Sequence, residues 1–503
     1  MTTRSTALLG MVHRNPGVTR ADAARLLGVG TGAATELVTR LSRAALLTQA
    51  PAAPSGTRGR PTTILLPHPD GPLVLALAIT HEAWRLDVVA LGGTALASLS
   101  ERHGGAPWAE VRAAVTVAIK DFLARYGDRL RAIGISVPGP VSRSLRLDAF
   151  NSDWHGIDLN DLWPEAGLLV AGNDATLAAT AEHRRGAATG AAVALHLRIE
   201  AGLGGAVIDD GHPVIGAHGA AGEFGHMPFG DPTVRCGCGA HGCWGTAVDG
   251  TALARLLGDP HPRDPVTYAR HVIATATRAL RSQRSRQDLA GLPPPTEAFP
   301  SVTPPTEALP SVTPPTTATP AATPQPAATP LTTTAATAAT PLTTAAAPLT
   351  TATAATPVSP SPPTTATPLT TATPTMPVIT ATAPTPVALG ALAAGSPYSS
   401  GESGPDIDPE AAAEAVRTVG VALGRGIAGL VNALDPDLVT LGGLGVDLLA
   451  AVPEVIDAAY RDGLMLIHRE SPPPVLPAAL PDDEGPIAGA AEEAWSALLP
   501  RLT

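Results

Sequence analysis

Residues 235–245 read RCGCGAHGCWG and hold all three cysteines of this 503-residue chain, Cys236, Cys238 and Cys243. An odd number of thiols cannot close entirely into disulfides, and two cysteines one residue apart would form a strained pair. Glycines between the cysteines let the backbone curl tightly enough for thiolates from one short loop to meet. The spacing therefore favours a cluster of metal-binding thiolates that lacks one ligand.

A candidate for the fourth ligand lies upstream, in the stretch GEFGHMPFG (222–230), where His226 precedes Cys236 by ten residues. Three cysteines and one histidine form a closed tetrahedral zinc set, which is structural because no position stays open for water. His241, inside the cysteine loop, is an alternative fourth ligand, and three reduced cysteines in a surface loop are the alternative without metal. We predict one structural Zn²⁺ per chain, bound by His226, Cys236, Cys238 and Cys243.

Charge is distributed unevenly along the chain. The formal net charge is −11, but residues 1–66 carry eight arginines against two acidic residues, a net +6 that leaves −17 for the remainder. A basic head on an acidic body is typical of a polyanion-binding module joined to a domain of another kind. No apolar run reaches the roughly 18 residues of a membrane span. Because the N-terminus lacks a secretory signal and the cysteines are read as reduced, we expect a cytoplasmic protein without a membrane partner.

Residues 1–66 have the pattern of a winged helix-turn-helix DNA-binding domain, with three amphipathic segments and then a hairpin at 46–67. Thr19 is the expected N-cap of the second helix. The alternative is a small helical protein-interaction domain, because Glu36 on the third helix would repel a phosphate unless it accepts a hydrogen bond from a cytosine amine. We expect DNA contacts from the outward face of the third helix and from the hairpin tip, namely Thr31, Ala33, Thr35, Thr39, Arg40, Arg58 and Arg60.

Beyond residue 72 the pattern changes to alternating strands and helices, which predicts an α/β fold with layered sheets flanked by helices over 72–291 and 405–503. Between these parts, residues 292–404 are rich in Thr, Pro and Ala and almost free of charge. Such dense proline removes backbone donors and prevents regular structure, so we expect a disordered insertion. A glycosylated mucin-like stalk is the alternative.

Several separate segments resemble the ROK family, named for repressors, open reading frames and sugar kinases. The resemblance covers about 72–291 and 405–503, and the GRP at 59–61 adds a likeness to the DNA-binding head of the repressor branch. It implies an actin-like, two-lobed ATPase-type fold, a zinc site beside a sugar pocket, and a homodimer or higher oligomer. The matching segments are GISVPGPV (134–141), NSDW (151–154), GNDATLAATAE (172–182), GAAGEFGHMPFGD (219–231), CGCGAHGC (236–243) and DPDLVTLGG (435–443).

The resemblance also implies the sugar contacts, which fall on Asn173, Asp174, Glu223 and His226. In family kinases the aspartate at Asp174 is the general base that takes a proton from the sugar hydroxyl. Carboxylates and an amide suit a ring of hydroxyls, each of which donates and accepts. By themselves, Asn173 and Asp174 would be read as a helix cap. His226 would bind zinc through one ring nitrogen and leave the other free for the sugar.

Two departures from the family pattern concern ATP. The first phosphate loop reads LALAITHEAWRL (75–86), with Ala78 near the expected aspartate, and the second reads EAGLGG (200–205), with Glu200 and Ala201 where phosphate would pass. A carboxylate there repels a triphosphate. We therefore expect a chain that is not an enzyme, with Asp174 as a vestigial base and no catalytic residues.

A third departure concerns the sugar. Gly245 stands where the family usually has a sugar-holding glutamate, which favours an unusual sugar, a sugar derivative, or no ligand. The function that we predict is a sugar-responsive DNA-binding transcriptional regulator, a repressor, that acts as a homodimer or higher homo-oligomer on a palindromic operator in double-stranded DNA. The alternatives are an ATP-dependent sugar kinase and a ligand-independent DNA-binding regulator.

Overall fold

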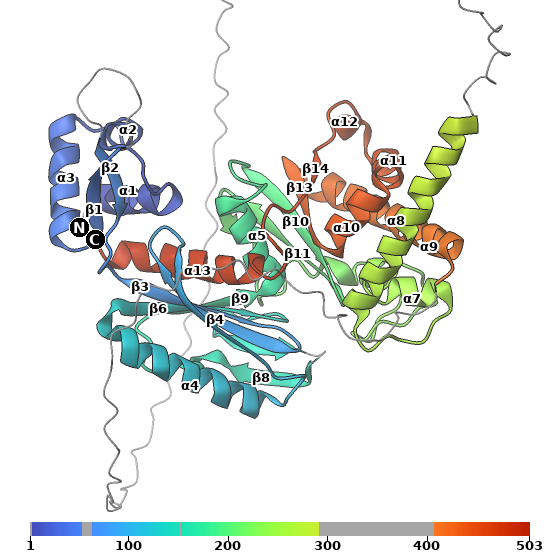
Figure 1. Cartoon of the computed structure of the whole chain (residues 1–503), viewed down its shortest axis with the longest axis horizontal. Helices are drawn as coiled ribbons and strands as arrows, with labels where there is room; N and C mark the ends of the chain where they lie inside the picture. Colours follow the sequence, from blue (N-terminus) through green and yellow to red (C-terminus); the bar gives the residue numbers. More distant parts are fainter. Residues whose placement is uncertain (1–2, 53–62, 150–151, 291–406) are drawn as a thin grey trace, which may run out of the picture. The chain divides into compact units, whose positions relative to one another are not determined.

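The computed structural model describes residues 3–52, 63–149, 152–290 and 407–503 (Figure 1). Two predictions made from the sequence lie outside these ranges: the hairpin tip with Arg58 and Arg60, and the insertion at 292–404. Within the described residues, no helix is both long enough and apolar enough to cross a membrane.

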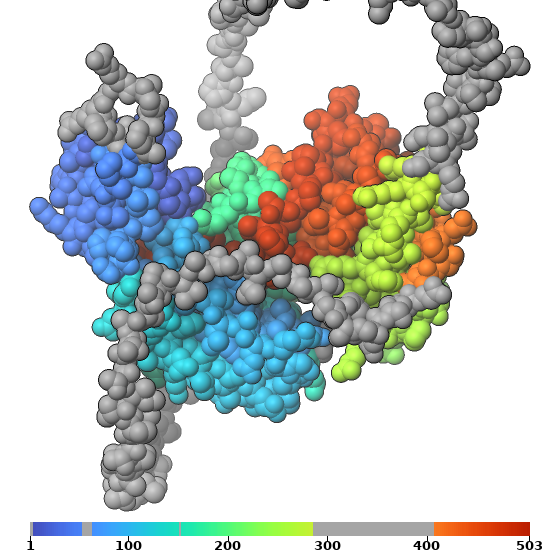
Figure 2. Space-filling model, in the orientation of Figure 1, coloured from blue at the N-terminus to red at the C-terminus, as the bar shows by residue number. Residues whose placement is uncertain are grey.

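The N-terminal elements are three helices and a two-stranded antiparallel sheet, in the order that the sequence predicts. Thr19 caps the second helix as expected, since its hydroxyl accepts a hydrogen bond from the backbone N–H of Asp22 at 3.0 Å. Figure 2 shows this blue group of elements at the molecular surface. The elements are α1 (Thr3–Arg14), α2 (Arg20–Leu26), α3 (Thr31–Arg43), β1 (Leu47–Pro51) and β2 (Thr63–Pro67).

A five-stranded mixed sheet follows, in the order β5-β4-β3-β6-β9. Its central strand β3 is buried on both faces, because α4 (Trp108–Tyr126) packs against one face and α13 (Gly485–Leu498) against the other. Gly134 on β6 permits the close approach of α13, since a Cβ there would lie 1.9 Å from the carbonyl oxygen of Ala490. The strands are β3 (Leu73–Ile79), β4 (Ala83–Ala90), β5 (Ala95–Arg102), β6 (Leu130–Val137) and β9 (Leu169–Asn173).

Short elements complete this first half of the chain. A two-stranded antiparallel sheet lies beside the larger sheet. One short 3₁₀ helix precedes β6 of the larger sheet, and another follows the small sheet in the chain. These elements are η1 (Gly127–Arg129), β7 (Arg146–Ala149), β8 (Trp154–Asp158) and η3 (Leu159–Leu162). The last strand of the larger sheet, β9, leads directly into α5 (Asp174–Arg185), as the strand, loop and alanine-rich helix in the sequence predict.

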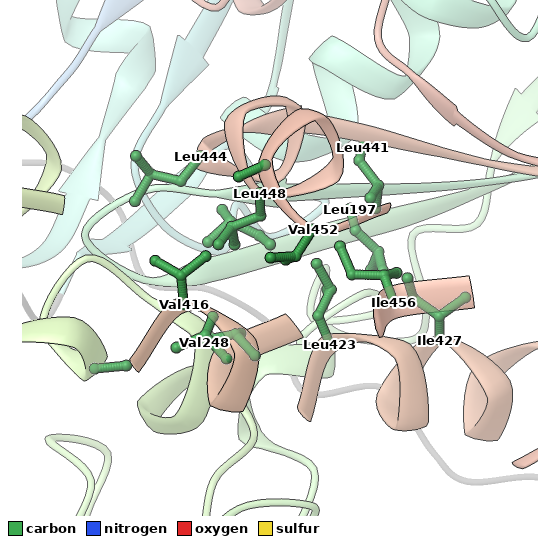
Figure 3. Close-up of a cluster of buried hydrophobic side chains, with 14 of the residues drawn as sticks. Leu197, Val248, Val416, Leu423, Ile427, Leu441, Leu444, Leu448, Val452 and Ile456 are labelled. Carbon is green, nitrogen blue, oxygen red and sulfur yellow. The ribbon is translucent and has the colours of Figure 1, made fainter. Parts of the chain in front are cut away.

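A second five-stranded sheet has the order β12-β11-β10-β13-β14. One of its faces, with Leu197 and Leu441, packs on a layer of helices and forms the apolar core drawn in Figure 3. The strands are β10 (Val193–Ile199), β11 (Leu203–Asp209), β12 (His212–Pro213), β13 (Leu438–Gly443) and β14 (Val475–Pro477).

The helices around this core come from both sides of the insertion, so residues 152–290 and 407–503 build one hydrophobic cluster. One of the two longest, α9, starts at a cap where the Asp408 carboxylate accepts from the Ala411 N–H at 2.9 Å. The remaining elements are η4 (Phe224–His226), α6 (Gly245–Val248), α7 (Ala252–Leu257), α8 (Pro265–Ala290), α9 (Pro409–Leu434), α10 (Leu444–Ala451), α11 (Pro453–Gly463), α12 (Leu466–Arg469) and η5 (Leu499–Arg501).

Candidate functional site

The four predicted metal ligands converge. The ligand atoms of His226, Cys236, Cys238 and Cys243 all lie within 4.8 Å of one another. The Sγ of Cys236 is 3.7 Å from the Nδ1 of His226, and the Sγ atoms of Cys238 and Cys243 are 3.7 Å apart. Positive φ angles at Gly239 (95°) and Gly242 (69°) produce the tight loop that brings the three thiols together.

The geometry fits a tetrahedral ion. Zn–S bonds of about 2.3 Å in a tetrahedron place two sulfurs about 3.8 Å apart, close to the separation found here. The cluster could therefore hold a metal ion and is compatible with zinc. His241 is not part of it: this residue is exposed and pairs through its backbone with Arg235.

His226 connects the cluster to the predicted sugar residues. Its Nδ1 faces the thiol of Cys236, while its Nε2 lies 3.7 Å from a carboxylate oxygen of Glu223. Burial raises the pKa of the Glu223 carboxyl; the nearby His226 opposes this shift, and the charge of Asp174 adds to it. Glu223, His226 and Asp174 thus belong to one electrostatic neighbourhood.

Asn173 and Asp174 stand at the junction of β9 and α5. The side chain of Asn173 is the N-cap of α5 and accepts from the N–H of Ala175 at 2.9 Å and of Thr176 at 3.4 Å. The cap geometry that the two residues suggest is therefore present, and it fixes the direction of both side chains. Asp174 also accepts from the Ala175 N–H at 2.9 Å through one carboxylate oxygen.

Gly245 begins α6 and lies beside the segment that carries Glu223 and His226. A Cβ at Gly245 would be 3.2 Å from the carbonyl oxygen of Gly225, which leaves little room for a side chain. The position is therefore close to the predicted sugar residues, and its glycine lets η4 approach α6 closely.

The predicted DNA-contacting residues of α3 divide into two groups. Thr31, Ala33 and Thr35 are exposed, as expected. Thr39 and Arg40 are half-buried, and the Nη2 of Arg40 donates to the hydroxyl of the fully buried Ser5 on α1 at 2.9 Å. Arg40 therefore does not face outward as predicted, because it lies towards the side of α3 that carries Leu37 and Val38 and packs on α1.

Sequence reasoning missed a polar group on the face of β10 opposite the apolar core. Arg198 and His196 are 8% and 3% exposed, and Arg198 forms an ion pair with Glu200. Both residues line a pocket together with Gly442 and Asp482. The signal was available in the stretch HLRI (196–199), where polar residues alternate with leucine and isoleucine, since alternation on a strand places polar residues on one face.

Comparison with known proteins matches part of this chain to one family. The ROK family model matches residues 87–288. A glucokinase of Streptomyces coelicolor is 35% identical over 136 residues, which cover 26% of this chain and 43% of that protein. A kanosamine kinase of Amycolatopsis mediterranei is 35% identical over 164 residues, or 31% and 51% of the two chains. The matches thus span about half the length of these relatives.

A solved structure matches over nearly the whole chain. It is described as a ROK family transcriptional regulator, homolog of the E. coli MLC protein, and it covers 99% of this chain and 97% of its own. The TM-score is 0.56 at 17% sequence identity, which shows a shared fold. The expected actin-like ROK fold, with mixed sheets and helices, is confirmed.

The comparisons also correct one prediction. The expectation that the chain is not an enzyme is wrong, because curated relatives that are 31–35% identical are named glucokinase and kanosamine kinase and point to a kinase. The prediction rests on three residues at positions of the two phosphate loops, namely Ala78, Glu200 and Ala201. It took no account of Arg198, a buried cation within electrostatic range of Asp174.

Proposed function

The chain carries a ROK family domain at residues 87–288, and from this premise we propose that it is a sugar-responsive DNA-binding transcriptional regulator. Residues 72–291 and 405–503 form the sugar-binding ROK domain, interrupted by the insertion at 292–404. Residues 1–66 form a winged helix-turn-helix domain that binds a palindromic operator as a homodimer. Zn²⁺ bound by His226 and the three cysteines braces the wall of the sugar site and takes no part in a reaction.

The observation that carries the proposal is a buried polar clasp between α1 of the head and two helices of the ROK domain. His13 on α1 and Glu492 on α13 are both 4% exposed. The Nδ1 of His13 accepts from the N–H of Gly92 at 2.9 Å, so Nε2 carries the proton and lies 3.1 and 3.2 Å from the Glu492 oxygens. The Nε of Arg185, the last residue of α5, donates to the same carboxylate at 2.6 Å.

The helix that ends in this clasp begins at the predicted sugar site. Asn173 and Asp174 stand at the first turn of α5, and Arg185 stands at its last. Along the helix, α5 packs closely on α13: a Cβ at Gly489 would lie 1.8 Å from the carbonyl oxygen of Leu177. Because packed helices shift as units, a movement of α5 caused by sugar at Asp174 reaches His13 of the head.

Apolar packing reinforces the clasp. Leu8, Leu9 and Val12 of α1 share one hydrophobic cluster with Trp495 and Leu498 of α13. The ring of His13 also packs on Trp495, with centroids 5.6 Å apart. The head is therefore held by the same helix that contacts α5, which supports a coupling between the two ends of the domain.

DNA binding is supported by the net charge of +6 over residues 1–66 and by the exposed face of α3 with Thr31, Ala33 and Thr35. The assignment is tested by selecting genomic DNA fragments on the purified, zinc-loaded chain at physiological salt. We expect a short palindrome to be recovered. Recovery of fragments without a common sequence, all released by moderate salt, would contradict operator recognition.

A second function is favoured by the curated relatives, which are named sugar kinases, and by Asp174. As an ATP-dependent sugar kinase, the chain would use Asp174 to accept the proton of the attacking sugar hydroxyl. Sugar-dependent release of ADP that disappears in Asp174→Asn would support this function. ATP turnover that is unchanged in Asp174→Asn would contradict the assignment of this base.

A further inference from the structure

The strongest unexplained feature outside the predicted sugar residues is the buried guanidinium of Arg198. It lines a small pocket between β10, β13, α5 and the start of α13, with a cavity volume of about 10 Å³ while Glu200 is paired with it. Its Nη2 donates to Glu200, but its Nε and Nη1 have no hydrogen-bond partner among the described residues. The Nε2 of His196, two residues earlier on the same face, likewise has none within the described ranges.

Unpartnered buried polar atoms are rare, because each costs about 1–3 kcal/mol when no partner replaces water. The neighbouring imidazole cannot supply a charge, because burial lowers the pKa of His196 to about 3. Its Nδ1 is already engaged with the hydroxyl of Thr440 at 2.8 Å. The Thr440 hydroxyl donates to the Leu195 carbonyl, so it accepts from Nδ1 of His196 and leaves Nε2 as an acceptor. The free N–H groups of Arg198 therefore suit a ligand with acceptor oxygens, and Nε2 of His196 can accept from a donor on the same ligand.

Arg198 remains charged in this setting. Burial would lower its pKa, yet the carboxylates of Glu200, Asp174 and Asp482 hold that pKa above its usual value. Two of these carboxylates are held in place by other interactions. Asp482 accepts from Arg270 Nη2 at 2.6 Å and from the Gly443 N–H at 2.8 Å, and Asp174 sits at the N-terminus of α5. Glu200 is the carboxylate that can leave.

We propose that Arg198 anchors a phosphoryl group of the bound ligand and that Glu200 occupies this anchor when the ligand is absent. The planar guanidinium, once released, offers the donor geometry that phosphate oxygens take in pairs. Asp174, within electrostatic range of Arg198, is the residue predicted to meet a sugar hydroxyl. The proposal rests on the proposed function only in that the ROK domain binds a sugar there.

The phosphoryl group has two sources, a sugar phosphate or a nucleoside triphosphate, and a binding experiment separates them. Isothermal titration of the zinc-loaded full chain would use glucose, glucose 6-phosphate, Mg-ATP and inorganic phosphate at constant ionic strength. We expect a phosphorylated probe to bind at least about tenfold more weakly to Arg198→Gln, which loses a charged hydrogen bond. The same probe should bind several-fold more tightly to Glu200→Gln, where the competing carboxylate is gone.

Opposite changes in probe affinity in the two variants are the decisive result. If the Arg198–Glu200 ion pair were purely structural, both substitutions would weaken binding of the probe. Arg461→Gln, an exposed arginine on α11, controls for the loss of one positive charge. Melting curves identify a variant that fails to fold, and Glu200→Gln then tests the anchor by itself. Equal affinities of all variants for every phosphorylated probe, or weaker binding by both Arg198→Gln and Glu200→Gln, would overturn the proposal.

The titrations also distinguish the proposal from the function on which it rests. Glucose that binds with the same affinity as glucose 6-phosphate, and equally to all variants, would overturn the phosphoryl anchor and leave sugar binding intact. If no sugar binds in either form, sugar sensing by these probes fails, while Mg-ATP and inorganic phosphate still report on Arg198.

Discussion

His226 presents its two ring nitrogens to two different groups, the thiol of Cys236 and the carboxylate of Glu223. If the cluster holds a metal ion, His226 would bind it through one ring nitrogen, while Glu223 orients the ring through the other. At the level of single residues, one side chain therefore links the cluster that could hold a metal ion to the predicted sugar residue Glu223.

Removal of one thiol tests the metal cluster. Cys238→Ala should reduce bound zinc from about one per chain to a small fraction, because three ligands hold the ion far less tightly than four. The melting temperature should fall by several degrees, since about 1 kcal/mol corresponds to about 2–4 °C in a domain of this size. Metal analysis and calorimetry make the measurements.

His241→Ala is the matched control, because His241 lies in the same loop but outside the cluster. It should keep its zinc and its melting temperature. A Cys238→Ala chain that retains one zinc and melts like the unaltered protein would show that the four residues do not form the site.

Glu492 gives a pH-dependent prediction. Burial would raise the pKa of its carboxyl, but His13 and Arg185 hold that pKa below its usual value. Its stabilising contribution is therefore complete above the unfolded pKa of about 4.3 and is lost as pH falls through the lower folded pKa. Glu492→Gln should reduce the free energy of unfolding by about 3 kcal/mol at pH 7.

The same difference should begin to shrink as pH falls below the unfolded pKa of about 4.3, and it should vanish only below the lower folded pKa, where the carboxyl is protonated in both states. Urea unfolding of both proteins at several pH values tests this dependence. A stability difference that stays constant from neutral to acidic pH would mean that the charge of Glu492 does not matter to the clasp.

At the scale of elements, the close packing of α5 on α13 connects the candidate site to the head, and one substitution tests it. Gly489→Ala places a methyl group 1.8 Å from the carbonyl oxygen of Leu177, so the two helices must separate. We expect a loss of about 2–3 kcal/mol in unfolding free energy, typical of overpacking. Chemical denaturation measures it.

Gly32→Ala is the control for this substitution, since Gly32 is also helical and its Cβ would meet nothing within 4 Å. That variant should be neutral or more stable by up to about 1 kcal/mol, because alanine favours helix more than glycine does. Equal stabilities of the two variants would contradict close packing of α5 on α13.

The helices and strands are the part of the fold that the local sequence pattern predicts best. The Thr19 cap, the strand before Asn173 and the long helix before DPDLVTLGG all follow from periodicity and capping. The inward turn of Arg40 does not, because it depends on the hydroxyl of Ser5, 35 residues away. The head-to-body clasp is equally non-local, since His13 and Glu492 are 479 residues apart in sequence.

The candidate site shows the same division. The spacing of the cysteines and His226 predicts their convergence because one short loop carries three ligands. Arg198 was missed because its meaning depends on Asp482 and Gly443, which a crossover brings beside β10. Roles of single loop residues such as Glu200 could therefore not be read from the loop alone.

At the scale of the whole molecule, the proposed function predicts that a sugar signal reaches the head through the clasp. Arg185→Gln should leave sugar affinity unchanged and reduce the effect of sugar on DNA affinity, because α5 loses its polar contact with Glu492. Arg184→Gln, whose parent side chain donates instead to the carbonyl of Gly211, should preserve that effect. Equal sugar responses in both variants would place the coupling elsewhere.

The central claim is that one ligand changes the affinity of this chain for its operator. The most direct measurement is fluorescence anisotropy of the selected operator fragment, titrated with the zinc-loaded chain with and without the sugar or sugar phosphate that binds best. Typical allosteric coupling of about 1–3 kcal/mol predicts a change in operator Kd of about 5- to 150-fold. Identical Kd values at saturating ligand would contradict sugar-responsive regulation.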